Sequence, residues 1–231
     1  MGIFNRKKKK VVYAKNYGFK MSKLTGNEFE YDDEPVYVVS NPNMSLPESF
    51  SYQEYLPNIL NQGNQPICVP CALEAHIDWN YNVDTDGKVK RINNVKIMDI
   101  FNIRKDNNSF DGMQIVEALE FLKNVGVKSD RGIHKIEKYC KVNSMLALRY
   151  ALILNGPCIG ALRVYNETND FWKRDYVGQE ILGGHAIAIV GYDKKGFIIR
   201  NSWGTSYGEK GYWHISYDDF SKFLEVWTII D

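Results

Sequence analysis

The chain has 231 residues, of which 44% are hydrophobic and 25% are charged, and its net charge is only +1. This composition excludes a wholly disordered chain, and no apolar run approaches the roughly 20 residues that a helix needs to cross a bilayer. Four cysteines are too few for a disulfide scaffold, and no secretory signal is recognisable. We therefore expect an intracellular (cytoplasmic) or virion-associated setting.

The N-terminal part of the chain has an uneven charge. Eight lysines and arginines lie between residues 6 and 23, and an acidic stretch follows at 28–34. Such a basic tail is either a solvated segment or a tether that binds a polyanion or an assembly partner through residues 6–23. The sequence predicts an extension over 1–45 and a compact domain over 46–231.

The first half of this domain, about 46–140, is predicted to be mainly helical. Residues 68–81 carry apolar side chains on most sides, which is typical of a buried central helix. A short amphipathic helix is predicted over 95–103. Two further helices are predicted over 111–125 and 143–155, with the polar first residue of each as its N-cap.

The second half, about 141–231, is predicted to be mainly β-structure. After Pro157 the chain consists of short segments that are rich in Ile, Val, Tyr and Trp and are separated by glycine or aspartate turns. The predicted strands are 158–165, 185–192, 196–201, 212–217 and 226–230. This segregation favours an α+β fold of two subdomains with a cleft between them.

Cys68 begins the predicted central helix, where a thiol is well placed to react. The unpaired N–H groups and the positive end of the helix dipole favour the thiolate. A nearby imidazolium would lower the thiol pKa further, and an asparagine oxygen would orient that imidazole without adding charge. His185 and Asn201 supply these two residue types. The Cys68 N–H and the Gln62 side-chain amide would supply two donors for an oxyanion.

The order and spacing of three sequence motifs resemble the papain-type (cathepsin-like) cysteine peptidases over residues 46–231. The motifs are Gln62-Gly63 with Cys68, Gly184-His185-Ala186 leading to Val190-Gly191-Tyr192, and Asn201-Ser202-Trp203-Gly204 with Gly211-Tyr212. The resemblance implies a helical half that carries the cysteine and an antiparallel, β-barrel-like half that carries the histidine and asparagine. It also implies a thiol endopeptidase that hydrolyses peptide or isopeptide bonds of a peptide or protein substrate and needs no cofactor.

The resemblance gives each matching position a role. Cys68 would be the nucleophile, His185 the general base and Asn201 the residue that orients it. Gln62 would complete the oxyanion hole, and Trp203 would shield the Asn–His hydrogen bond and face the substrate. Further substrate-binding positions, one pairing with the substrate backbone and the others forming an apolar pocket, would be Gly112, Met113, Ala161 and Ala186.

The sequence also departs from the family pattern. The usual second cysteine before the nucleophile is replaced by Gln65, and the extension is shorter than the family's inhibitory prosegment, which suggests a short tether or a plug. Two alternatives stay open. The chain would be a catalytically inactive papain-like structural or binding module, or a dithiol redox protein that uses Cys68 and Cys71.

Overall fold

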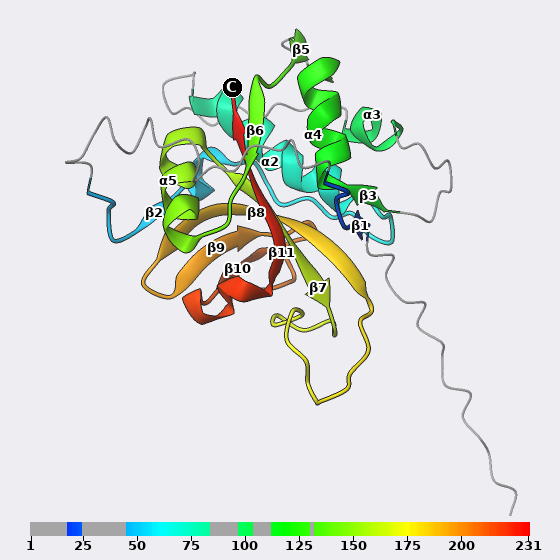
Figure 1. Cartoon of the computed structure of the whole chain (residues 1–231), viewed down its shortest axis with the longest axis vertical. Helices are drawn as coiled ribbons and strands as arrows, with labels where there is room; N and C mark the ends of the chain where they lie inside the picture. Colours follow the sequence, from blue (N-terminus) through cyan, green and yellow to red (C-terminus); the bar gives the residue numbers. More distant parts are fainter. Residues whose placement is uncertain (1–17, 25–44, 84–96, 104–111, 130–131) are drawn as a thin grey trace, which may run out of the picture.

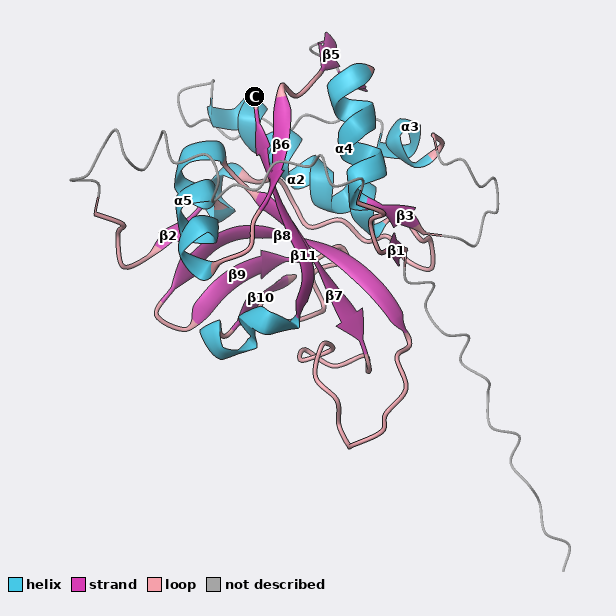
Figure 2. Cartoon of the chain, viewed as in Figure 1, coloured by secondary structure: helices cyan, strands magenta, loops and turns pink. Residues whose placement is uncertain are grey.

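A curved sheet of seven strands packs against a long buried helix (Figures 1 and 2). The computed structural model describes residues 18–24, 45–83, 97–103, 112–129 and 132–231. The α-helices within these ranges are α2 (Cys68–Val83), α3 (Ile97–Phe101), α4 (Ile115–Asn124) and α5 (Met145–Asn155), and 3-10 turns are formed by η2 (Gln53–Tyr55) and η3 (Tyr217–Lys222). In the part of the chain that is described, no helix is long and apolar enough to span a membrane.

The large sheet has the strand order β10–β9–β8–β7–β11–β6, and the short β2 pairs with β8. All of its pairings are antiparallel. The strands are β2 (Phe50–Ser51), β6 (Lys138–Lys141), β7 (Cys158–Val164), β8 (Gly183–Asp193), β9 (Gly196–Arg200), β10 (Tyr212–Ile215) and β11 (Phe223–Ile230). The predicted α+β class, with helices mainly first and strands mainly second, is confirmed.

Two small strand pairs complete the fold. The strand β1 (Phe19–Lys20) runs parallel to β3 (Met113–Gln114), and β4 (Val127–Ser129) runs antiparallel to β5 (Gly132–His134). Figure 1 shows β1, in dark blue, beside β3. Phe19 and Lys20 belong to the predicted N-terminal extension over 1–45. They nevertheless pair with a strand of the domain.

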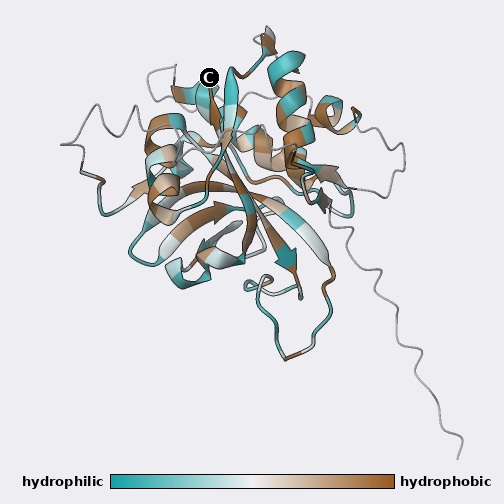
Figure 3. Ribbon diagram, in the orientation of Figure 1, coloured by the Kyte–Doolittle hydropathy of each residue, from teal (hydrophilic) through white to brown (hydrophobic). Residues whose placement is uncertain are grey.

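The two faces of the large sheet enter different cores. Successive side chains of a strand point to opposite faces. On β11, Trp227 and Ile229 join the core around α2, whereas Val226 joins the core around α5. Figure 3 shows apolar residues concentrated in the strands of the sheet. One face of the sheet thus packs against α2 and the opposite face packs against α5.

Two helices begin differently from the prediction. The helix α4 starts at Ile115, because the residues before it are extended and pair with β1; the predicted cap Asp111 lies outside the described residues. The helix α5 is capped by Ser144, whose hydroxyl accepts the Ala147 N–H at 3.1 Å, so the prediction of Asn143 as the cap is wrong.

Candidate active site

Cys68 is the first residue of α2 and is completely buried. The Ala186 N–H donates to its sulfur (N···Sγ 3.4 Å), and the backbone amide of Gly18 also acts on the sulfur. Burial raises the pKa of the Cys68 thiol to about 11, although these amides oppose the rise. The sequence predicts that the helix N-terminus lowers this pKa. With the cleft covered, burial raises it instead, because the cost of burying a thiolate exceeds the stabilisation from the surrounding N–H groups.

His185 on β8 and Asn201, directly after β9, are in contact. His185 Nε2 lies 2.8 Å from Asn201 Oδ1, and the same oxygen accepts the Ser202 N–H at 2.6 Å. Because a carbonyl oxygen can only accept, Nε2 carries the proton in the neutral imidazole and Nδ1 is the basic nitrogen. The asparagine thus fixes the tautomer that a general base needs.

Two aromatic rings hold the His185 imidazole in place. The indole of Trp203 stacks on it, with ring centroids 4.4 Å apart and an angle of 24° between the planes. The ring of Phe171 meets the imidazole edge-on at 5.6 Å and also contacts Trp203 at 5.1 Å. Trp203 is only 4% exposed, so it excludes water from the His185–Asn201 hydrogen bond. Phe171 was not predicted from the sequence, because it lies in an irregular loop without a motif.

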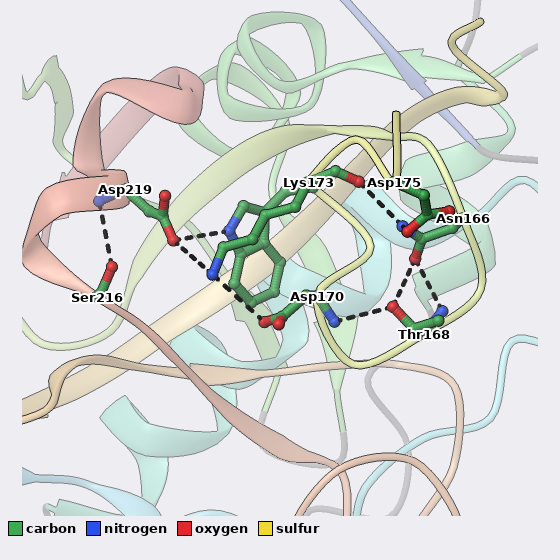
Figure 4. A network of polar contacts seen from close by, with 8 residues as sticks. Asn166, Thr168, Asp170, Lys173, Asp175, Ser216 and Asp219 are labelled. Atoms are coloured by element: carbon green, nitrogen blue, oxygen red, sulfur yellow. Dashed lines mark hydrogen bonds and ion pairs between the residues drawn. The ribbon is translucent and has the colours of Figure 1, made fainter. Parts of the chain in front are cut away.

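A polar network fixes the loop that carries Phe171 (Figure 4). Asp219 of η3 accepts hydrogen bonds from the Trp172 indole at 3.3 Å and from the Lys173 ammonium at 3.1 Å. Earlier in the loop, Asn166 Oδ1 accepts the Thr168 hydroxyl at 2.6 Å. These bonds on both sides of Phe171 hold its ring against the imidazole.

Gln62 lies six residues before Cys68 and is 6% exposed. Its Oε1 accepts the Ser202 hydroxyl at 2.6 Å, and its Nε2 donates to the Gln65 carbonyl oxygen at 2.8 Å. A carboxamide nitrogen carries two hydrogens, so one hydrogen remains for a substrate oxygen. Through Ser202, Gln62 is also joined to the segment that holds Asn201.

Residues 18–24 form a segment that we call the blocking segment, and its first residue, Gly18, lies against the sulfur of Cys68. The Gly18 carbonyl accepts the Met113 N–H at 2.7 Å, and Phe19 and Lys20 continue as β1 beside β3. Gly18 is so close to the loop before α2 that a Cβ atom on it would lie 2.1 Å from the Pro66 carbonyl oxygen. The chain therefore covers its own candidate nucleophile.

The side chain of Phe19 occupies the predicted apolar pocket. It is 7% exposed and belongs to one buried cluster with Cys68 and with the three predicted pocket residues, Met113, Ala161 and Ala186. Two glycines permit this close approach. A Cβ atom on Gly112 would lie 2.1 Å from the Gly18 carbonyl oxygen, and one on Gly184 would lie 2.5 Å from the Phe19 ring. Gly112 is the position predicted to pair with a substrate backbone. The hydrogen bond to the blocking segment is made instead by the N–H of the next residue, Met113.

Comparisons with known proteins agree with this arrangement. A family model described as "Papain family cysteine protease" matches residues 120–223, the stretch that contains His185 and Asn201. Cathepsin O from Homo sapiens is 24% identical in an alignment that covers 77% of this chain and 63% of cathepsin O. The viral cathepsin of Cydia pomonella granulosis virus is 25% identical in an alignment that covers 91% of this chain and 70% of that protein. The chain thus spans slightly less than two thirds of cathepsin O.

Solved structures show the same fold. Xylellain, a cysteine protease from Xylella fastidiosa, superposes with a TM-score of 0.75 at 22% identity, over 94% of this chain and 96% of xylellain. The procathepsin B S9 from Trypanosoma congolense superposes with a TM-score of 0.72 at 16% identity, over 93% of this chain and 86% of that chain. The predicted papain-like fold is confirmed. The chain thus has the papain-like fold and is similar in sequence to the papain-family cysteine proteases.

Proposed function

We propose that this protein is a cysteine peptidase whose cleft is closed by its own blocking segment. The observation that carries the proposal is the buried contact of His185 with Asn201, beside Cys68 and under a segment of the same chain. A thiol at a helix N-terminus, a histidine of fixed tautomer and an amide donor are the groups that acyl transfer requires.

In the open enzyme, His185 Nδ1 takes the proton of the Cys68 thiol, and the sulfur attacks the carbonyl carbon of the substrate. The Cys68 N–H and Gln62 Nε2 stabilise the resulting oxyanion. His185 then returns the proton to the leaving amine, which leaves an acyl-thioester on Cys68. A water molecule, deprotonated by His185, attacks the thioester, releases the carboxylic acid and restores the thiol.

The Gly18 carbonyl of the blocking segment is not held as a scissile carbonyl. Its oxygen accepts the Met113 N–H, whereas the predicted oxyanion donors are the Cys68 N–H and Gln62 Nε2. This contact and the burial of the Phe19 side chain favour a plug over a passive tether.

The two alternative functions leave the site geometry unexplained. A dithiol mechanism with Cys68 and Cys71 has no use for the His185–Asn201 pair, and burial raises the Cys71 pKa well above its ordinary value. An inactive module needs none of these polar contacts. Binding of a polyanion by the basic tail remains a prediction, since residues 6–17 lie outside the described residues. Lys20 and Lys23 lie beside a cavity of about 610 Å³ that two glutamates also line.

The pH dependence of alkylation tests the proposed function. In the natural chain, a thiol with a pKa near 11 is protonated at pH 5–7, so iodoacetamide is expected to modify Cys68 slowly there. In the full chain carrying Gly18→Ala, which displaces the segment, we expect rapid modification near pH 5. The further substitution His185→Ala should abolish the fast reaction. Peptide mass mapping measures each cysteine separately. Fast Cys68 modification in the Gly18→Ala chain that persists unchanged after His185→Ala would reject an assembled thiol–imidazole pair.

The hydrogen bond of Asn201 provides a second test of the mechanism. In the Gly18→Ala chain, Asn201→Ala is expected to lower kcat roughly 100-fold. Without the hydrogen bond to Asn201, the His185 imidazole can rotate away from the orientation in which Nδ1 accepts the thiol proton. KM should change little, since Asn201 lies behind His185. Steady-state hydrolysis of a small fluorogenic peptide measures both constants. An unchanged kcat would show that Asn201 does not position the base.

A further inference from the structure

We propose that Cys71 forms a reversible disulfide bond with the nucleophile Cys68 when the opened enzyme meets hydrogen peroxide. This inference rests on the proposed peptidase function and adds an oxidative modification site to it. The two cysteines are separated by Val69 and Pro70, and both stand in the first turn of α2. The disulfide inactivates the enzyme until a thiol reductant opens it.

The spacing of the two cysteines suits a disulfide. Residues three apart on an α-helix lie on the same face, and the helix geometry places their Cα atoms about 5 Å apart. Disulfides join residues whose Cα atoms are about 4.4–6.8 Å apart. Cys68 and Cys71 are both buried, and both thiols are free in the observed state.

The first turn of α2 can make the small adjustment that the bond requires. The two Cβ atoms have to approach to about 3.8 Å, whereas a regular helix holds residues three apart at about 5–6 Å. The first N–H groups of a helix have no partner within it, and the third residue here is Pro70, which has no N–H. The Cys71 N–H donates to the Ile67 carbonyl oxygen at 3.1 Å. A shift of Cys68 therefore breaks no helical hydrogen bond donated by the residues that precede Cys71.

Ala186 of β8 links the surroundings of the two thiols. Its N–H donates to the Cys68 sulfur (N···Sγ 3.4 Å), and it lines a small internal cavity together with Cys71 and Ser202. Burial raises the pKa of the Cys71 thiol well above its ordinary value, while the charge of Arg200 and the Ser202 hydroxyl favour the thiolate. Both thiols thus lie near the same residue of the sheet, within one buried region.

The reaction balances with hydrogen peroxide as the oxidant. In the open enzyme, His185 holds the proton of Cys68, and the Cys68 sulfur attacks one peroxide oxygen. The O–O bond breaks, Cys68 becomes a sulfenic acid, and the hydroxide that leaves takes up the proton from His185. The Cys71 sulfur then attacks the Cys68 sulfur, and the sulfenic hydroxyl leaves with the Cys71 proton as water. The two thiols lose two electrons, and one peroxide is reduced to two water molecules.

A neighbouring thiol protects the nucleophile from irreversible loss. A sulfenic acid without a thiol partner is oxidised further to a sulfinic acid, which dithiothreitol does not reduce. A disulfide instead returns both thiols by exchange with dithiothreitol. Because Cys68 is completely buried under the blocking segment, we expect the disulfide to form faster in the Gly18→Ala chain than in the natural chain.

The test maps the disulfide in the full chain carrying Gly18→Ala. The chain is treated with excess hydrogen peroxide, and its free thiols are blocked in denaturant with N-ethylmaleimide. Thiols that dithiothreitol then releases are labelled with iodoacetamide. Peptide mass mapping is expected to find the iodoacetamide label on Cys68 and Cys71 in equal amounts, and N-ethylmaleimide on Cys140 and Cys158.

Recovery of hydrolysis provides the second readout. After peroxide and then dithiothreitol, the Gly18→Ala chain should regain most of its activity towards a small peptide. The same chain with Cys71→Ala should regain roughly tenfold less, because its sulfenic acid has no thiol partner. Cys140→Ala, at a buried cysteine on β6, removes a thiol from the sheet instead and should recover like the parent chain.

Three results overturn the proposed disulfide. They are an iodoacetamide label on neither cysteine of α2, a label that pairs Cys68 with a cysteine other than Cys71, and equal recovery of the parent and Cys71→Ala chains. The labelling also keeps the inference separate from the proposed function. If the Gly18→Ala chain hydrolyses no peptide before peroxide is added, the peptidase proposal fails, and the labels on Cys68 and Cys71 alone decide on the disulfide.

Discussion

The full-length chain carrying Gly18→Ala is expected to hydrolyse a small peptide roughly tenfold to hundredfold faster than the natural chain. The added Cβ atom would lie 2.1 Å from the Pro66 carbonyl oxygen, 2.2 Å from its carbonyl carbon and 2.7 Å from its Cα. These are backbone atoms, which cannot turn away as a flexible side chain can. Overpacking of this kind costs about 1–3 kcal/mol, and each 1.4 kcal/mol changes the population of the open state tenfold.

A matched control for this prediction lies in the same segment. Met21 is 55% exposed, so Met21→Ala should leave the segment in place and the rate unchanged. Initial rates of the three chains at equal concentration, with thermal unfolding to verify the fold, measure the effect. If Gly18→Ala displaces the segment, as judged by faster alkylation of Cys68, and hydrolysis still does not rise, then the blocking segment does not control the activity.

Replacing Cys68 by alanine in the Gly18→Ala chain is expected to reduce hydrolysis to the background rate. The substitution removes the nucleophile, and loss of the nucleophile from a triad of this kind costs about a millionfold in kcat. The fold should persist, because alanine is compatible with the first turn of α2 and is smaller than cysteine. Single-turnover measurements with excess enzyme are sensitive enough to detect the residual rate.

The neighbouring thiol provides the control for this second prediction. Cys71 is also buried and also lies in the first turn of α2, so Cys71→Ala alters the packing of the same helix without touching the nucleophile. Its activity should be close to that of the parent chain. Loss of activity in both variants would favour the dithiol interpretation, and activity that survives Cys68→Ala would exclude Cys68 as the nucleophile.

Local sequence patterns predicted those parts of the structure that depend on local chemistry. The apolar residues of 68–81 predicted α2, which extends two residues further, and alternating or β-branched runs predicted β7 to β11. The motif spacings led to Cys68, His185, Asn201 and Gln62, whose side chains the fold gathers at one site. Their catalytic roles remain predictions that the experiments above test.

Features that depend on contacts distant in sequence were not predictable in this way. The blocking segment is placed by Pro66, Met113 and Gly184, which are 48 to 166 residues away from Gly18 along the chain. Phe171 has a role only because its loop returns to His185. Glu225 can accept the Ser22 hydroxyl only because β11 pairs with β7 in one register, and the sequence contains no signal of that register.

The blocking segment and the site belong to one polypeptide, joined by residues 25–44, and this connection determines how inhibition responds to concentration. Closure is a unimolecular step, so dilution of the enzyme does not release the segment. Linkers of about this length give effective concentrations on the order of millimolar. A separate peptide with the sequence of residues 18–24 must therefore reach about that concentration to inhibit an opened enzyme equally well. A substrate must therefore compete with the effective concentration of the attached segment, which does not depend on the concentration of the enzyme.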